Sequence, residues 1–252
     1  MNRPAEIIAH RGASKDAPEN TLASVQLAWA QGADAVEIDV QLSRDGQLVV
    51  IHDDTTRRTA RVRKPVSAQA LAELRTLDAG RWKSAKFAGE KIPTLNEVLA
   101  TVPSGQRLFV EIKCGPECVP AFVEAFQLSG KAPEQVVPIG FALPTMALVK
   151  QALPALEVCW VTDFHRTLRG WAPTAAELIA PAKDAGLDGL DVDGRGPVDA
   201  AFAQQVHDAG LRLYIWTVDA PAKARRLLAA GVDGLTTNRP GWLRAQLEGN
   251  EG

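Results

Sequence analysis

Several patterns are scarce in this 252-residue chain, and each shortage narrows the possible functions. No apolar run approaches the roughly 18 residues that suggest a membrane-spanning helix, so we expect no stable membrane insertion. The net charge is −2, without the basic excess that is typical of nucleic-acid-binding proteins, so we expect no nucleic-acid partner. The first residues lack the pattern of a secretory signal, which predicts a cytoplasmic protein.

Cysteine is also rare, with residues only at positions 114, 118 and 159. An odd number of cysteines cannot pair completely within one chain, so we expect reduced thiols. Cys114 and Cys118 have the spacing of half a zinc site, but no second half follows them. The cysteines therefore predict neither a disulfide framework nor a zinc centre.

Short β-branched segments alternate with longer segments rich in Ala and Leu. This alternation predicts parallel strands joined by crossover helices, and several similar Gly-containing turns favour a closed (β/α)₈ TIM barrel. No linker or low-complexity segment divides the chain, so we expect a single domain over residues 1–252. The eight barrel strands are predicted at about 6–10, 34–41, 107–113, 135–140, 156–161, 187–192, 211–217 and 232–236.

Residues 35–42 and 47–52 break the alternation, because the segment between them is too short for a helix. Asp45-Gly46 lies in this gap, and Asp-Gly between two apolar runs is a strong hairpin signal. We therefore predict an antiparallel hairpin arm after the second barrel strand. A two-residue turn would place Asp39 opposite His52.

The segment 55–92 is too long for an ordinary βα loop, which usually has about 2–6 residues. Its leucines have helical spacing over residues 68–77, which predicts a small helical insertion that packs over part of the barrel mouth. The basic stretch Arg57–Lys64 would then lie near the entrance. A solvated loop that attracts no ligand is the alternative.

Three carboxylates on two of the predicted strands indicate a cation site. Glu37 and Asp39 are two residues apart, so they share one face of a strand, and both faces of a parallel barrel strand are buried. Two buried like charges are costly unless one is protonated or a cation lies between them. An antiparallel edge strand with both acids in solvent is the alternative. Glu111 and Lys113 repeat the spacing with opposite charges, which also suits a structural ion pair.

The remaining candidate residues lie at strand ends, where a TIM barrel places its active site. His10 and His52 each end an apolar strand, although a lone strand-end histidine is more often a surface or capping residue. Arg11 adds a fixed positive charge that would suit an anionic phosphate. Trp216 ends another strand, either as a core residue or as an apolar wall against a substrate.

At this point the chain resembles a known family, the glycerophosphodiester phosphodiesterases. The motifs that carry the resemblance occur in family order from about residue 6 to residue 240. They are His10-Arg11-Gly12, Pro18-Glu19-Asn20-Thr21, Glu37-Ile38-Asp39-Val40, Asp45-Gly46, His52-Asp53, Ile92-Pro93-Thr94-Leu95, Glu111-Ile112-Lys113, Trp216-Thr217-Val218 and Gly231-Val232-Asp233-Gly234.

The resemblance implies metal-dependent hydrolysis of a small-molecule glycerophosphodiester to sn-glycerol 3-phosphate and an alcohol. It implies one divalent cation, and the all-oxygen ligand set suits Mg²⁺ or Ca²⁺. It assigns the metal to Glu37, Asp39 and Glu111, general base and acid catalysis to His10 and His52, and phosphate binding to Arg11 and Lys113. The sequence does not indicate an oligomeric state.

Some positions depart from the family pattern and leave the choice of substrate open. Gly140-Phe141 stands where Ser-Phe is usual, and Asp219 stands where Asn is common. The alternative enzyme is a phosphodiesterase of the same architecture that acts on lysophospholipids or inositol phospholipids. A non-catalytic phosphate-binding barrel would not need the two histidines, and neither would a metal-dependent aldolase or isomerase barrel.

Overall fold

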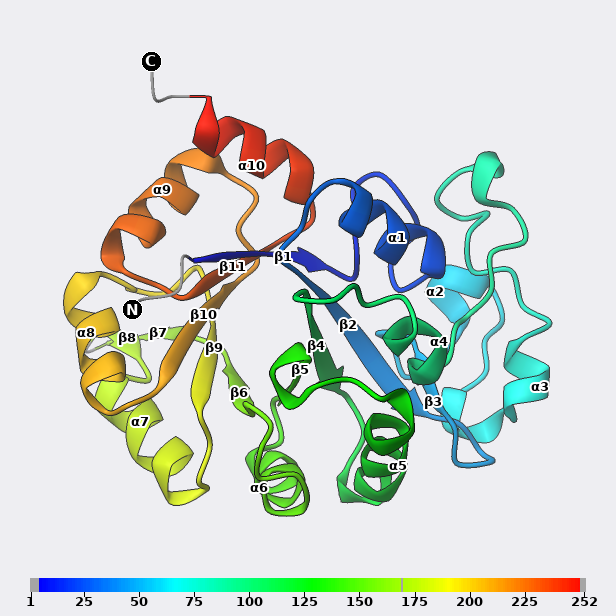
Figure 1. Cartoon of the computed structure of the whole chain (residues 1–252), viewed down its shortest axis with the longest axis horizontal. Coiled ribbons are helices and arrows are strands. Elements are labelled where there is room, and N and C mark those ends of the chain that lie inside the picture. Colours follow the sequence, from blue (N-terminus) through cyan, green and yellow to red (C-terminus); the bar gives the residue numbers. More distant parts are fainter. Residues whose placement is uncertain (1–4, 169, 250–252) are drawn as a thin grey trace.

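A computed structural model describes residues 5–168 and 170–249 of the chain. Within these residues, eight parallel strands form a closed ring, because β1 pairs with both β2 and β11 (Figure 1). The strands follow one another around the ring in chain order. They are β1 Glu6–His10, β2 Ala35–Leu42, β4 Arg107–Ile112, β5 Val136–Gly140, β6 Cys159–Thr162, β9 Gly189–Asp193, β10 Arg212–Trp216 and β11 Gly234–Thr237. The predicted TIM barrel is confirmed.

Helices surround the ring and cover its outer face (Figure 1). They are α1 Leu22–Ala30, α4 Leu95–Leu99, α5 Val119–Ser129, α6 Leu143–Ala152, α7 Ala175–Asp184, α8 Ala200–Asp208, α9 Pro221–Ala230 and α10 Pro240–Glu248. Thr174 caps the N-terminus of α7. Its side chain accepts a hydrogen bond from the N–H of Glu177, and the Glu177 carboxylate accepts one from the N–H of Thr174. Such a reciprocal pair satisfies N–H groups that have no partner inside the helix.

The alternation along β2 determines what faces the centre of the barrel. Val36, Ile38 and Val40 are buried in the apolar layer between the strand and helices α1 and α4. Glu37 and Asp39 therefore lie on the inner face, where Glu37 is 3% exposed and Asp39 is 0% exposed. The alternative in which both acids lie in solvent is excluded.

The predicted antiparallel arm is present, but its predicted register is wrong. Strand β3, Leu48–Val50, pairs with β2 so that Val40 lies opposite Val50. The turn has three residues, because the Ser43 N–H donates to the Gln47 carbonyl across it. Gly46 closes this loop at φ +77°, a left-handed conformation that glycine adopts without strain.

The longer loop shifts the pairing by one residue, so that the backbone of Asp39 lies opposite Ile51 and not His52. The Ile51 N–H donates to the Asp39 carbonyl at 3.0 Å. β3 has already ended at Val50. The alternation of the strand therefore no longer controls the direction of His52.

The predicted helical insertion is present, although it consists of short pieces and not one long helix. They are α2 Arg57–Ala60, α3 Leu71–Leu74 and the 3₁₀ turns Val66–Ala68 and Ala85–Phe87. Leu74 is 0% exposed and packs with Val49 and Ile51 of the hairpin arm, while Leu71 and Leu77 lie at the edge of this cluster. The insertion thus has an apolar core of its own against the arm.

A second hairpin was not predicted. Strands β7, His165–Thr167, and β8, Gly170–Ala172, pair with each other after β6. Each has only three residues, and β7 is exposed while β8 is exposed or partly buried, so neither carries the apolar alternation by which strands are recognised. Among the described residues, none of the helices combines the length and apolar character needed to cross a membrane.

Candidate active site

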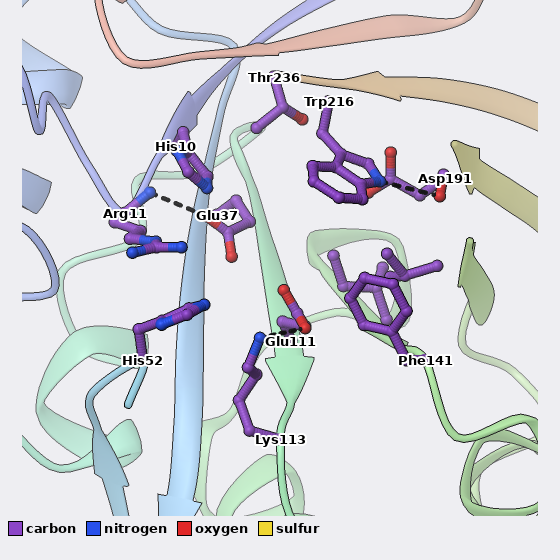
Figure 2. A pocket seen from close by; sticks show the side chains of 12 residues that line it. His10, Arg11, Glu37, His52, Glu111, Lys113, Phe141, Asp191, Trp216 and Thr236 are labelled. Atoms are coloured by element: carbon purple, nitrogen blue, oxygen red, sulfur yellow. Dashed lines mark hydrogen bonds and ion pairs between the residues drawn. The ribbon is translucent and has the colours of Figure 1, made fainter. Parts of the chain in front are cut away.

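A cavity of about 280 Å³ opens at the carboxyl ends of the barrel strands. Seven of the eight predicted site residues line it, and Figure 2 shows them converging from several strands. They are His10, Arg11, Glu37, His52, Glu111, Lys113 and Trp216. Asp39, the eighth, is buried directly behind the wall of the cavity.

The three predicted metal ligands lie together. Glu37, Asp39 and Glu111 each bring one carboxylate oxygen to within 4.8 Å of the others. Burial and the neighbouring carboxylates raise the pKa of Glu37 well above its usual range, and they raise the pKa of Glu111 to about 7. Without a bound metal ion, this cluster therefore holds protons that exposed carboxyl groups would release, despite the charges of Arg11 and Lys113.

Arg11 and Asn20 hold the acids of β2 in place, and both adopt a left-handed backbone conformation. The Arg11 N–H donates to Glu37 Oε2 at 2.8 Å, and Arg11 Nε lies 3.1 Å from Asp39 Oδ2. Asn20 donates to Asp39 Oδ2 through its side-chain amide, and its amide oxygen accepts the N–H of Asp39. One oxygen of each acid, Glu37 Oε2 and Asp39 Oδ2, is thus held by these two residues.

The other side of the carboxylate cluster carries oxygens without hydrogen-bond donors. Glu37 Oε1 and Asp39 Oδ1 are buried and accept no hydrogen bond from the described residues. A buried carboxylate oxygen without a donor is costly, and a hard cation would satisfy both oxygens at once. The residues present therefore fit a divalent cation with oxygen ligands.

Lys113 follows β4 and closes the cluster from the opposite side. Its Nζ lies 2.7 Å from Glu111 Oε1 and 3.6 Å from Asp39 Oδ1. Burial alone would lower the pKa of Lys113, but the two carboxylates outweigh burial and raise it. Lys113 is therefore a fixed cation at the wall of the cavity, and it lies over the ring of Phe141.

His10 is held by an amide. Its Nδ1 lies 2.8 Å from Asn238 Oδ1, and Asn238 Nδ2 donates to Asp219 Oδ2 at 2.7 Å. Because the amide nitrogen is committed to a carboxylate, the amide oxygen faces His10, so Nδ1 carries the proton and Nε2 keeps its lone pair. Burial and the Arg11 charge lower the pKa of His10, which keeps the ring neutral.

His52 is held by a carboxylate. Its Nδ1 lies 2.8 Å from Asp53 Oδ1, and Arg58 binds both oxygens of Asp53. Arg58 also binds both oxygens of Glu19, which in turn accepts from Arg11. Arg58 belongs to the basic stretch of the insertion, so this stretch contacts the partners of His52 and Arg11, although Arg58 itself does not line the cavity.

The opposite side of the cavity is mostly apolar. Phe141 and Trp216 meet edge to face with ring centroids 5.9 Å apart, and Ile139 and Val161 complete the wall. Trp216 is therefore a wall of the cavity and not a core residue alone. Asp191 of β9 also lies here, 2% exposed, with its carboxyl directed into the cavity (Figure 2).

The sequence did not identify every residue of the site. Glu19 and Asn20 belonged to a recognised motif, but they had no assigned role until the structure placed them against Arg11 and Asp39. Asn238 gave no signal, because it touches His10 from the other end of the chain. Asp191 could have been found, since Asp191-Val192-Asp193 repeats the acid spacing of Glu37-Ile38-Asp39 on a barrel strand.

Comparisons with known proteins agree with this geometry. A glycerophosphodiester phosphodiesterase of Caldanaerobacter subterraneus subsp. tengcongensis is 35% identical over 244 residues, which cover 93% of this chain and 94% of that protein. One of Bacillus subtilis is 32% identical, with 92% and 83% covered. The structure of an Oleispira antarctica phosphodiesterase in complex with the product sn-glycerol-3-phosphate is 29% identical, superposes with a TM-score of 0.86 and covers 96% of each chain.

The sequence also matches a family profile over nearly its whole length. The match runs over residues 10–242 and includes all the residues that line the cavity. It confirms the expected enzyme class, a phosphoric diester hydrolase. The chain belongs to the glycerophosphoryl diester phosphodiesterase family.

Proposed function

We propose that this chain hydrolyses glycerophosphodiesters to sn-glycerol 3-phosphate and an alcohol, with one bound divalent cation, Mg²⁺ or Ca²⁺. Glu37, Asp39 and Glu111 would hold the cation, which when bound would neutralise negative charge on the phosphate. The observation that carries the proposal is the arrangement of the cavity. Three carboxylates face two histidines across a space large enough for a small phosphodiester, and two of the three are buried with one oxygen that accepts no hydrogen bond from the described residues.

The partners of the two histidines support a different role for each. His10 presents an unprotonated Nε2, because its Nδ1 donates to an amide oxygen, so we assign His10 as the general base. His52 has Nδ1 on the Asp53 carboxylate, and a carboxylate in this position stabilises a protonated imidazole ring during proton transfer. We therefore assign His52 as the general acid that protonates the leaving alkoxide.

The cationic side chains would bind the phosphate. Arg11 and Lys113 line the cavity on either side of the carboxylates, and their charges would oppose the negative charge that develops on the phosphate oxygens. Trp216 and Phe141 would pack against the carbon skeleton of the substrate. The base would activate either water or the 2-hydroxyl of the glyceryl group, and the second route passes through a cyclic phosphate.

The proposal is tested by the release of sn-glycerol 3-phosphate from glycerophosphocholine, glycerophosphoethanolamine and glycerophosphoglycerol. We expect activity with Mg²⁺ or Ca²⁺ and its loss in excess chelator. Lysophosphatidylcholine and phosphatidylinositol complete the panel as substrates of the alternative function. Cleavage of these lipids alone, or full activity in chelator, would contradict the proposal.

A further inference from the structure

Asp191 is a buried carboxyl group that the proposed chemistry does not use. It lies on β9, which is four strands away from β2 in either direction around the ring. Glu37 and Asp191 are thus on opposite sides of the cavity, with Glu111 of β4 between them (Figure 2). The residues level with Asp191 on the two adjacent strands are Val161 of β6 and Tyr214 of β10, and neither is charged.

Among the described residues, none donates a hydrogen bond to the Asp191 carboxyl that would explain its burial. Oδ1 accepts no hydrogen bond from the described residues, and Trp216 Nε1 donates to the backbone carbonyl of Asp191 and not to its side chain. Burial, together with the nearby Glu111, raises the pKa of Asp191 well above its usual range. An unpaired polar group in an apolar wall costs stability, so a ligand that satisfies it is the natural explanation.

We infer that Asp191 determines specificity by hydrogen bonding to the terminal hydroxyl of the glyceryl group of the substrate. The inference deepens the proposed function and rests on it. A ligand whose phosphate lies at Glu37 and Glu111 must extend across the cavity to reach Asp191, and the terminal hydroxyl is the polar group of the glyceryl moiety farthest from the phosphate.

The position of Asp191 also indicates which half of the diester it meets. The glyceryl group is common to all glycerophosphodiesters, whereas the alcohol varies in size and charge. A residue that is only 2% exposed suits the constant part, because a variable group needs open space. A neutral carboxyl both donates and accepts a hydrogen bond, as a hydroxyl does, so this pair leaves neither group unsatisfied.

The test compares two diesters that differ only in this hydroxyl. Glycerophosphoethanolamine carries it, and the matching diester of propane-1,2-diol lacks it but keeps the 2-hydroxyl. We expect the unmodified enzyme to prefer the glyceryl diester by at least about 10²-fold in kcat/KM, because a site built for a hydroxyl rejects an analogue without one. Asp191→Leu should reduce this preference to less than about 10-fold by slowing the glyceryl diester alone.

Two further variants separate binding from folding. Asp191→Asn should keep most of the preference, because an amide still donates and accepts. Asp193→Asn is the matched control: Asp193 is on the same strand but binds Arg195 and does not line the cavity, so the preference should stay unchanged. The melting temperature of Asp191→Leu should not fall, since the change removes an unpaired buried carboxyl.

The possible results separate the role of Asp191 from the proposed function. An unchanged preference in Asp191→Leu, or an equal loss on both diesters with a lower melting temperature, would overturn the role of Asp191. The absence of any preference in the unmodified enzyme would do the same. If the unmodified enzyme cleaves neither diester, the proposed function itself fails.

Discussion

At the residue scale, the two histidines of the cavity differ in what their Nδ1 atoms contact, an amide oxygen for His10 and a carboxylate for His52. If they act as base and acid, replacement of either by Ala should lower kcat by roughly 10²–10⁴-fold. KM should change much less, because Arg11 and Lys113 still bind the phosphate. Steady-state kinetics on glycerophosphocholine measure both constants.

A substrate with an acidic leaving group distinguishes the two roles. A nitrophenolate needs little protonation as it departs, so glycerophospho-p-nitrophenol should partly rescue His52→Ala but not His10→Ala. The opposite pattern would exchange the roles. Near-normal turnover in both variants on natural diesters would mean that the histidines are structural.

The amide that binds His10 predicts a pH effect. As a base, His10 must be neutral, so kcat/KM falls as the pH falls through the pKa of His10, which burial and Arg11 hold below 6.5. Asn238→Asp would place a carboxylate against Nδ1, favour the charged ring and move this acid limb to higher pH. The pH profile at saturating cation measures the shift. An unmoved acid limb would exclude His10 as the group that titrates there.

Glu111 links cation binding to stability. The folded chain keeps this carboxyl protonated up to a pKa of about 7, compared with 4.5 for an ordinary Glu. Without a cation, the folded state therefore holds more protons between these values, and the free energy of unfolding falls as the pH rises through this window. A cation opposes that loss, so Mg²⁺ or Ca²⁺ should raise the melting temperature more at pH 8 than at pH 5.

Thermal unfolding with and without chelator measures this difference. Glu111→Gln cannot ionise, so it should remove much of the pH dependence of the metal-free protein. An equal rise in melting temperature at both pH values would separate cation binding from these carboxyl groups.

At the scale of elements, the barrel strands could be predicted because most of them are short apolar runs between longer segments rich in Ala and Leu. The inward direction of Glu37 and Asp39 followed from the same alternation. The register of the hairpin arm could not be predicted in this way. An Asp-Gly pair fits turns of two or three residues, and only the hydrogen bond between Ser43 and Gln47 decides between them. Contacts between distant segments, such as His10 with Asn238, have no local pattern at all.

The insertion offers a prediction at this scale. Leu74 is completely buried between the insertion and the hairpin arm that carries His52. Leu74→Ala should lower the free energy of unfolding by about 2–5 kcal/mol, the usual cost of a large cavity in a core. Leu168→Ala is the matched control, because Leu168 is fully exposed and should change stability by less than about 0.5 kcal/mol. Chemical denaturation measures both, and equal effects would mean that the insertion does not unfold with the barrel.

At the scale of the whole molecule, the two ends of the barrel differ in the polar residues they carry and in the role of those residues. The carboxyl ends of the strands hold the cavity, whereas the amino ends are closed by a buried polar cluster around Arg107. Arg107 is 3% exposed and binds Glu6 at 2.8 Å, Glu157 at 2.9 Å and the Tyr214 hydroxyl at 3.1 Å. In barrels of this class, residues at the amino ends serve stability and those at the carboxyl ends serve chemistry.

This division predicts opposite effects for changes at the two ends. Arg107→Met keeps an apolar stem of similar length but leaves Glu6 and Glu157 close together without their shared cation. The free energy of unfolding should fall by about 3–5 kcal/mol, as when one partner of a buried ion pair is removed. At a temperature where the variant is folded, kcat should stay within a few-fold, because Arg107 begins β4 at the end remote from the cavity. His52→Ala should do the reverse, with slow turnover and nearly unchanged unfolding. Chemical denaturation and kinetics on both variants test this, and a large loss of kcat in folded Arg107→Met would show that the two ends are coupled.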